Sequence, residues 1–367
     1  MNLLPDAVPL GEVRRALVIK LRHHGDVLLA SPVISVLKRH APGVAIDALV
    51  YADTAQMLSL HPGLDQLHLV GRDWKAAGGF TRLAAEWALY RRLAARRYDL
   101  LIHLSESWRG AWLARLLGAR WTVAPERKGA SRRWRASFTH LVRSPLIGGR
   151  HVVESNLDAL RRIGLQPAPQ ERELVLEPGD EARLAVQALI DANGLQDRRF
   201  VHIHPTSRWR FKGWNSAGWA EIVRRLQSDG WPVVMTAAPE SAETSMTAAL
   251  QRQLERPVID FSGRLSLKEL AALTARARLF VGVDSAPMHI AAAMRTPAVA
   301  LFGPSGFDLW GPWGTPREGR HRVVASTRHG CRPCGLDGCG GGKVSDCLET
   351  LEPDRVWEAV RAELGAP

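Results

Sequence analysis

The sequence predicts an α/β fold of two doubly wound, Rossmann-like domains that face a cleft. Three observations lead to this prediction: a length of 367 residues, an alternation of short apolar segments with helical segments, and a Pro-rich stretch between two such runs. A chain of this length exceeds one ordinary domain and suits two domains of roughly 150–200 residues each. Strands separated by helices are typical of a parallel sheet that helices cover on both faces.

The first run of alternating segments occupies the N-terminal half. Its apolar segments predict strands at 16–21, 45–51 and 99–104, and helical spacing is found at 27–40, 81–97 and 110–117, with a further helix starting at 54–60. The pair Pro42-Gly43 ends the first of these helices, because neither residue favours its continuation.

The second run follows a linker at 164–180 that is rich in Pro and also holds a short candidate strand at 173–176. Strands are then expected at 200–204, 231–237, 258–261, 279–283 and 297–302, and helices at 180–192, 215–229, 241–254, 266–277, 285–294 and 353–364. The expected domains are therefore 1–178 and 179–352, and the segment 353–367 is expected to form a helix that packs back on the first domain. Ligands of such sheets bind at the carboxyl ends of the strands.

Composition and charge narrow the class of protein. Hydrophobic residues make up 46 % of the chain and charged residues 23 %, which is ordinary globular composition. No apolar run reaches the length of about 18 residues that a transmembrane helix needs, and the N-terminus lacks the apolar core of a signal peptide, so we expect a cytoplasmic protein. The net charge of +12 indicates an anionic partner: nucleic acid, an anionic membrane face or a phosphorylated substrate.

The first motif is Leu-Arg-His-His-Gly-Asp at 21–26, between the first strand and a helix. Its single glycine does not make the GxGxxG fingerprint, which argues against a nicotinamide enzyme. Asp26 is interpreted either as the N-cap of the helix or as a general base that takes a proton from a hydroxyl group. His23 and His24 are candidates for binding an acidic molecule or for the base, and Arg22 is a candidate for binding phosphate.

The second motif, at 204–214, leaves a strand and leads into a helix. It concentrates the hydroxyl groups of Thr206 and Ser207 with two arginines and Lys212. Hydroxyls, backbone N–H groups and a lysine together favour a diphosphate site. The alternative is a solvated basic loop.

The third motif, at 281–289, runs from a buried strand into Asp284 and Ser285 and then into a helix. Either residue is able to cap that helix, and Pro287 suits its first turn. The functional interpretation places the Asp284 carboxylate at the tip of the strand, where it accepts hydrogen bonds from sugar hydroxyls. The N–H groups of the helix start would then face phosphates. His289, one turn further, is either a structural residue or a ligand contact.

The fourth motif is a Gly-rich segment with four cysteines, Cys331, Cys334, Cys339 and Cys347. Four thiols at this spacing are able to make a tetrahedral zinc site, although the spacing is not that of two CxxC knuckles. Reduced thiols in an ordered loop and a disulfide pair are the alternatives, and a cytoplasmic location argues against the disulfide.

Four runs of residues together resemble one family. The run LVIKLRHHGDVLLASP at 17–32, the loop at 204–214, the segment at 280–289 and the cysteine tail at 334–348 are similar to the signatures of the lipopolysaccharide core heptosyltransferases of glycosyltransferase family 9. The Arg-His-His-Gly-Asp variant and the cysteine tail are most similar to the branch of third core heptosyltransferases. The resemblance extends over about 15–360. It implies a GT-B fold, an inverting mechanism without a metal, and ADP-heptose as donor of L-glycero-D-manno-heptose.

The resemblance also implies roles for single residues. By position, Asp26 matches the catalytic base, while Thr206, Ser207 and Lys212 match the contacts to the donor diphosphate. Asp284 matches the contact to the donor sugar and diphosphate.

Further donor contacts follow from the same resemblance. An acidic residue after the strand at 231–237 holds the ribose in the family, and Glu240 is the expected match, with Glu243 as the other choice. The start of the following motif contributes Ser285, Ala286 and His289 to donor binding, and Ala286 stands where the family often has glycine.

The first domain is then the acceptor-binding domain and the second the nucleotide-sugar-binding domain. The implied partners are ADP-heptose, a heptose of the lipopolysaccharide inner core and the cytoplasmic face of the inner membrane, where the protein is expected to be peripheral, with no nucleic acid. The acceptor-binding candidates are Arg22, His23, His24, Arg127 and Lys128. Two other functions remain as alternatives: another GT-B nucleotide-sugar transferase or epimerase, and a basic nucleic-acid-binding protein with a zinc module. No cofactor is expected in catalysis, and zinc is expected only as a structural ion.

Overall fold

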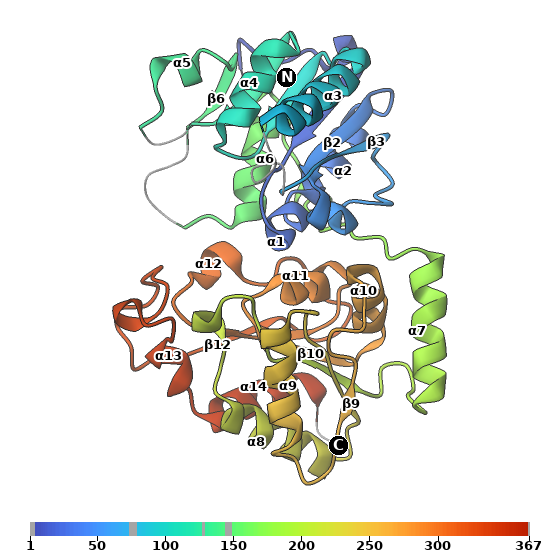
Figure 1. Ribbon diagram of the computed structural model, residues 1–367, viewed down its shortest axis with the longest axis vertical. Coiled ribbons are helices and arrows are strands. Elements are labelled where there is room, and N and C mark those ends of the chain that lie inside the picture. The colour runs from blue at the N-terminus through green and yellow to red at the C-terminus, as the bar shows by residue number, and fades with distance from the viewer. Residues whose placement is uncertain (1–3, 73–78, 127–128, 144–148, 366–367) are drawn as a thin grey trace. The chain divides into compact units, whose positions relative to one another are not determined.

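The computed structural model describes residues 4–72, 79–126, 129–143 and 149–365 (Figure 1). The chain forms two compact units, Met1–Glu177 and Pro178–Pro367. The division falls one residue from the boundary expected after 178. Each unit holds one six-stranded parallel sheet with helices packed against it.

The sheet of the first unit has the strand order β3-β2-β1-β4-β5-β6. Its strands are β1 (Arg15–Ile19), β2 (Ala45–Tyr51), β3 (Gln66–Val70), β4 (Leu100–His103), β5 (Trp121–Pro125) and β6 (His140–Val142). The three strands expected from the sequence are β1, β2 and β4, which occupy the middle of the sheet and are almost wholly buried. The other three lie toward the edges of the sheet and were not predicted.

The helices of the first unit are α1 (His24–Leu28), α2 (Ser31–His40), α3 (Gly79–Arg96), α4 (Trp108–Leu116), α5 (Arg132–Arg135) and α6 (Val152–Arg162), with 3-10 turns η1 (Leu10–Glu12), η2 (Ala52–Met57) and η4 (Pro169–Glu171). The single helix expected at 27–40 is two helices, because Pro32 has no N–H to donate and its ring would clash with the carbonyl four residues earlier. The strand expected at 173–176 does not form. There the Val175 N–H donates instead to Ser31 Oγ at 2.9 Å.

One face of this sheet carries a continuous apolar core. Leu17 and Ile19 alternate along β1 and pack with Leu89 and Leu93 of α3 and with Trp134 of α5. All five side chains are almost completely buried. Burial of each such side chain is worth about 1.5–3 kcal/mol, so this cluster holds α3 and α5 against the sheet.

The sheet of the second unit has the order β12-β11-β10-β7-β8-β9. Its strands are β7 (Val201–His204), β8 (Val233–Met235), β9 (Ile259–Asp260), β10 (Leu279–Val283), β11 (Ala298–Phe302) and β12 (Arg322–Ala325). All five strands expected from the sequence are present, and β12 is an addition at the edge. Counted along each unit, both sheets have the strand order 3-2-1-4-5-6, in which the chain reverses direction between the first and fourth strands.

The helices of the second unit are α7 (Asp180–Ala192), α8 (Ser216–Ser228), α9 (Ser241–Gln251), α10 (Leu267–Arg276), α11 (Ala286–Ala293), α12 (Phe307–Trp310), α13 (Asp346–Glu349) and α14 (Pro353–Leu364), with 3-10 turns η5 (Arg210–Lys212) and η6 (Cys339–Gly341). The last helix belongs to this unit: Val356, Val360 and Leu364 are buried in the same cluster as β7, β10 and α8. Its apolar stripe is buried within the second unit, and the expectation that the helix packs back on the first domain stays a prediction. Among the residues that the structure describes, no helix is both long and apolar enough to cross a membrane.

Candidate functional site

Asp26 lies in the loop-to-helix turn that follows β1. It is the third residue of α1, and the N-cap position belongs to His23. The interpretation of Asp26 as the helix cap is therefore wrong. Its carboxylate is partly exposed, and Oδ1 lies 4.0 Å from Nε of Arg22. The side chain thus lies at the carboxyl edge of the first sheet, beside Arg22.

A buried lysine underlies this turn and was not predicted as a site residue. Lys20 directly follows β1, and its Nζ donates to the backbone carbonyl of Leu104 at 2.9 Å and to Asn156 Oδ1 at 3.0 Å. Burial lowers the pKa of Lys20 to about 8, and the charge of Asp26 acts in the opposite direction. The signal in the sequence is a charged residue inside the otherwise apolar run ALVIKL.

The predicted acceptor residues are spread along the same loop. The side chain of Arg22 is 63 % exposed, and its carbonyl accepts a hydrogen bond from Arg72. His23 is exposed, while Nε2 of His24 lies 2.9 Å from the carbonyl of Asp53. The structure thus places three predicted residues beside Asp26. The other two, Arg127 and Lys128, lie outside the described residues.

In the second unit, the two predicted motifs meet at the carboxyl edge of the sheet. Lys212 ends the turn after β7, and Asp284 directly follows the neighbouring strand β10. The Lys212 Nζ lies 2.7 Å from Oδ2 of Asp284, whose side chain is buried. This edge is the point where the strand order reverses, at which doubly wound sheets bind their ligands.

The contact between Lys212 and Asp284 is a close ion pair, in which the ammonium of Lys212 compensates the buried carboxylate. A ligand that offers an anion to the lysine and donates a hydroxyl to the carboxylate would replace this contact. The Lys212 side chain is 23 % exposed, so its ammonium is also accessible to an anion.

The hydroxyl residues of the same loop differ in their surroundings. Thr206 is buried, and its Oγ1 donates to Glu243 Oε2 at 2.5 Å. Ser207 is half-buried and accepts a hydrogen bond from the N–H of Trp209. Glu243 therefore belongs to this loop cluster, whereas Glu240 is exposed at the N-cap of α9 and makes no capping bond with its side chain.

The third predicted motif continues into α11. Ser285 occupies the N-cap position, but its hydroxyl donates to the carbonyl of Val283 and does not cap the helix. Ala286 is the first helical residue, and His289 is buried one turn along. The backbone start of α11 thus directly follows the Asp284 carboxylate.

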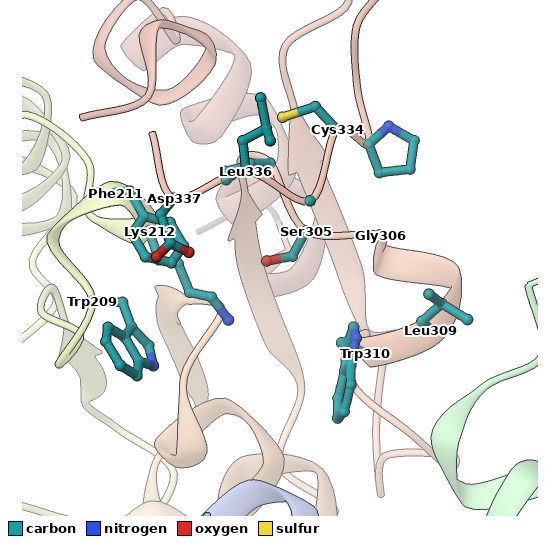
Figure 2. A pocket seen from close by; sticks show the side chains of 13 residues that line it. Trp209, Phe211, Lys212, Ser305, Gly306, Leu309, Trp310, Cys334, Leu336 and Asp337 are labelled. Carbon is teal, nitrogen blue, oxygen red and sulfur yellow. The ribbon is translucent and has the colours of Figure 1, made fainter. Parts of the chain in front are cut away.

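A pocket of about 510 Å³ opens beside Lys212. It is lined by three segments, namely Trp209, Phe211 and Lys212; Pro304, Ser305, Gly306, Leu309 and Trp310; and Pro333, Cys334, Gly335, Leu336 and Asp337. Figure 2 shows the Lys212 ammonium and the Ser305 hydroxyl between the indoles of Trp209 and Trp310. Apolar walls with a few polar groups are typical of a small-molecule site. This pocket was not predicted from the sequence, because its three segments are far apart along the chain.

The cysteine segment supports the Lys212 loop. Ser345, between Cys339 and Cys347, donates from Oγ to the carbonyl of Phe211 at 2.7 Å. Trp214 Nε1 donates to the carbonyl of Leu351 at 3.0 Å. These two bonds attach the loop that carries Lys212 to the C-terminal segment.

The four thiols are free, with Cys347 buried and the other three exposed. Burial raises the pKa of the Cys347 thiol. Within the described part of the chain, no group of three or more His, Cys, Asp or Glu side chains is placed so that it could hold a metal ion. The arrangement therefore does not fit the expected zinc site.

Together, the doubly wound sheets and the Lys212–Asp284 pair at a strand-order reversal are typical of an α/β protein that binds a ligand at the carboxyl ends of its strands. A family model described as glycosyltransferase family 9 (heptosyltransferase) matches residues 86–339. The chain belongs to this family and is a glycosyltransferase. The family predicted from the sequence is thereby confirmed.

Curated relatives agree with this assignment. The chain is 38 % identical over 295 residues to lipopolysaccharide heptosyltransferase 3 of Escherichia coli, a match that covers 80 % of this chain and 84 % of that one. It is 29 % identical over 371 residues to lipopolysaccharide heptosyltransferase 1 of Pseudomonas aeruginosa, covering 96 % and 99 %.

Solved structures confirm the GT-B fold. A family 9 glycosyltransferase of Veillonella parvula matches with a TM-score of 0.82 at 23 % identity, covering 98 % of this chain and 99 % of that one. The Escherichia coli heptosyltransferase WaaC with ADP matches with a TM-score of 0.71 at 19 % identity, covering 95 % and 99 %. A UDP-GlcNAc 2-epimerase of Methanocaldococcus jannaschii also matches, with a TM-score of 0.52 at 11 % identity, covering 96 % and 93 %. The fold alone therefore does not separate a transferase from an epimerase, whereas the family model does.

Proposed function

We propose that the protein transfers L-glycero-D-manno-heptose from ADP-heptose to a heptose of the lipopolysaccharide inner core, with inversion at the anomeric carbon. The relatives that share 36–38 % identity with it are named lipopolysaccharide heptosyltransferase 3. A structural relative has been solved with ADP and with ADP-2-deoxy-2-fluoro heptose. The observation that carries the proposal is the Lys212–Asp284 pair, which offers one cation and one buried carboxylate at the strand edge of a family 9 enzyme.

The donor half of the proposal uses the second unit. Lys212 and Ser207 bind the diphosphate, because an ammonium and a hydroxyl are donors to phosphate oxygens. Thr206, whose buried hydroxyl donates to Glu243, positions the loop that carries them. Asp284 accepts a hydrogen bond from a heptose hydroxyl, and Ser285, Ala286 and His289 complete the donor site at the start of α11. The ribose contact falls to an acidic residue after β8. Glu243 is favoured over Glu240, since only Glu243 contacts the Thr206 loop.

The acceptor half uses Asp26 as the base. Its carboxylate takes the proton of the acceptor hydroxyl while the acceptor oxygen bonds to the anomeric carbon of heptose. The bond from that carbon to the diphosphate oxygen breaks, and ADP leaves with the bonding electrons. Attack opposite the leaving group inverts the anomeric carbon. Lys212 stabilises the charge that develops on the departing ADP, so the chemistry needs no metal.

The remaining acceptor contacts are cationic. Arg22, His23 and His24 are proposed to bind the anionic groups of the core, together with Arg127 and Lys128. An acceptor of this kind is anchored in lipid, which places the enzyme at the cytoplasmic face of the inner membrane as a peripheral protein. The cysteine segment is assigned no metal and takes no part in the chemistry.

The proposal is tested by measuring ADP release from ADP-heptose with a purified core whose terminal sugar is heptose. ADP release that depends on the acceptor, and a product with the opposite anomeric configuration by NMR, are the expected results. Cores that lack the terminal heptose serve as the control. Equal ADP release with and without the terminal heptose would contradict the proposed acceptor. Nucleotide release from UDP-sugars but not from ADP-heptose would contradict the proposed donor.

A further inference from the structure

Two neighbouring helices of the first unit expose large apolar side chains. On α3 these are Leu83 and Trp87; on α4 they are Trp108, Trp112 and Leu116. The five side chains, which we call the α3–α4 patch, are between 45 % and 68 % exposed. Tryptophan is highly buried on average, so three exposed indoles in one place require an explanation.

The spacing of these residues produces a second apolar stripe on each helix. Trp108, Trp112 and Leu116 are four residues apart along α4, so they line one face. Leu83 and Trp87 have the same spacing on α3. The core-facing positions are separate: Leu89 and Leu93 of α3, and Ala111, Leu113 and Ala114 of α4, are buried. Both helices are therefore apolar on an outward face that the described residues of the unit leave exposed.

The contacts between α3 and α4 join the two stripes into one surface. Arg109 of α4 pairs with Glu86 of α3. The Tyr90 hydroxyl reaches the carbonyl of Leu116 at 3.4 Å, and the rings of Tyr90 and Trp87 are 5.3 Å apart. Figure 1 likewise shows α3 and α4 as neighbours in the first unit.

Cations surround the patch. Arg91 and Arg92 are exposed on the last turns of α3, and Arg115 is exposed on α4. Arg115 also donates to Ser137 Oγ at 2.7 Å, which brings the exposed Arg132 and Arg133 of α5 next to α4. Of the nearby acids, Glu86 is neutralised by Arg109, and Glu106 is exposed before α4. The rim is thus predominantly positive.

We propose that the α3–α4 patch docks the protein on a bilayer that contains acidic phospholipids. Tryptophan is the residue that favours the membrane–water interface, and leucine beside it enters the acyl boundary. Arginines around an apolar stripe are attracted to anionic headgroups within a Debye length of the surface. The positive rim complements the negative charge of an acidic lipid surface. The patch lies on the outer faces of two helices and contains none of the residues proposed for donor or acceptor binding.

Docking is tested with the purified full-length protein and vesicles, without substrate. The probes are vesicles of phosphatidylglycerol with phosphatidylcholine, and vesicles of phosphatidylcholine alone. The wild-type protein is expected to sediment with the acidic vesicles, to blue-shift its tryptophan fluorescence, and to be released by high salt. The double variant Trp87→Ser/Trp112→Ser should bind about tenfold less, because two interfacial indoles are removed.

A matched pair of leucines controls for surface hydrophobicity in general. Leu116→Ser should weaken binding severalfold, whereas Leu184→Ser on α7, where the side chain is 71 % exposed, should leave binding unchanged. The proposal would be overturned if the wild-type protein did not bind acidic vesicles, or if the double variant bound them as the wild type does. A dimer in solution that Trp112→Ser converts to monomer would instead assign the patch to a second copy of this chain.

An activity measurement separates this proposal from the proposed function. With a delipidated, water-soluble core acceptor, the double variant should retain wild-type turnover. With acceptor embedded in acidic vesicles, its activity should fall in parallel with its binding. Normal vesicle binding without any heptose transfer would support membrane docking and contradict the proposed function.

Discussion

The two units have the same strand order but use the reversal point of the sheet differently. In the first unit, a lysine after the first strand, Lys20, is buried and donates to Leu104 and Asn156. In the second, Lys212 is partly exposed and pairs with Asp284, which follows the fourth strand of that unit. Lys20 completes a buried hydrogen-bond network. Lys212 is positioned to leave the Asp284 carboxylate and bind an anionic ligand instead.

This difference divides the proposed chemistry between the units. The first unit keeps its cation away from solvent and presents the Asp26 carboxylate. The second presents a cation beside hydroxyls, as stabilisation of a leaving diphosphate requires. A shared topology therefore supports a proton acceptor in one unit and an anion site in the other, and the site residues, rather than the fold, decide which.

The largest expected effect is the loss of the base. Asp26→Asn should lower kcat by about 10²–10⁴-fold, since the amide cannot take the acceptor proton while the side-chain shape is kept. The measurement is ADP release under saturating donor and acceptor. ADP binding, followed by calorimetry, should be unchanged because Asp26 is assigned to the acceptor half. A variant with near-normal kcat would assign the base to another residue.

A somewhat smaller effect is expected from the second unit. Lys212→Ala should lower kcat/KM by about 10²–10³-fold, as removal of one preorganised electrostatic contact to a developing charge does. It should also weaken ADP binding, in contrast to Asp26→Asn. Lys212→Arg is the matched control, which keeps the charge and should retain part of the activity. Unaltered ADP affinity in Lys212→Ala would remove this lysine from the diphosphate site.

The burial of Lys20 predicts that the free energy of unfolding depends on pH. The pKa of Lys20 is lowered to about 8 in the folded state, so between about pH 8 and its ordinary value of 10.5 the unfolded chain binds more protons. The free energy of unfolding should therefore rise with pH across this window, by up to about 3 kcal/mol relative to Lys20→Met.

Urea unfolding of both proteins from pH 7 to pH 10.5 measures this difference. Parallel stability curves for the wild type and Lys20→Met would show that Lys20 titrates normally in the folded state.

The smallest expected effect concerns the pocket beside Lys212. Trp310→Ala should raise the KM for a sugar substrate by about 2–10-fold, which corresponds to the loss of one aromatic contact. Trp310→Phe keeps an aromatic face and should recover most of the affinity. Steady-state kinetics with donor and acceptor varied in turn would show which sugar occupies the pocket. No change in either KM would mean that neither sugar contacts Trp310.

Sequence reasoning predicted the central strands of each sheet and missed most of the strands toward the edges. The strands β1, β2, β4, β7, β8, β10 and β11 are apolar segments whose burial can be anticipated from composition alone, and β9 was the one edge strand that was predicted. The missed strands β3 and β6 have no comparable apolar run. In the edge strand β3, Gln66 is exposed and His68 is buried, and β6 is three residues long. They form because a neighbouring strand offers its backbone groups, which no local pattern reveals.

The sequence by itself determined the family, the two-unit α/β class and the loops that carry Asp26, Lys212 and Asp284, because these depend on local composition and on motifs that are continuous in the chain. Only the tertiary structure decided the partners of those residues. Parallel strands that are neighbours in a sheet are distant in sequence, so the ion pair of Lys212 with Asp284 and the contact of Thr206 with Glu243 exist only once the sheet has formed. The same is true of the outward stripes of α3 and α4, whose spacing is visible in the sequence but whose exposure depends on what packs around them.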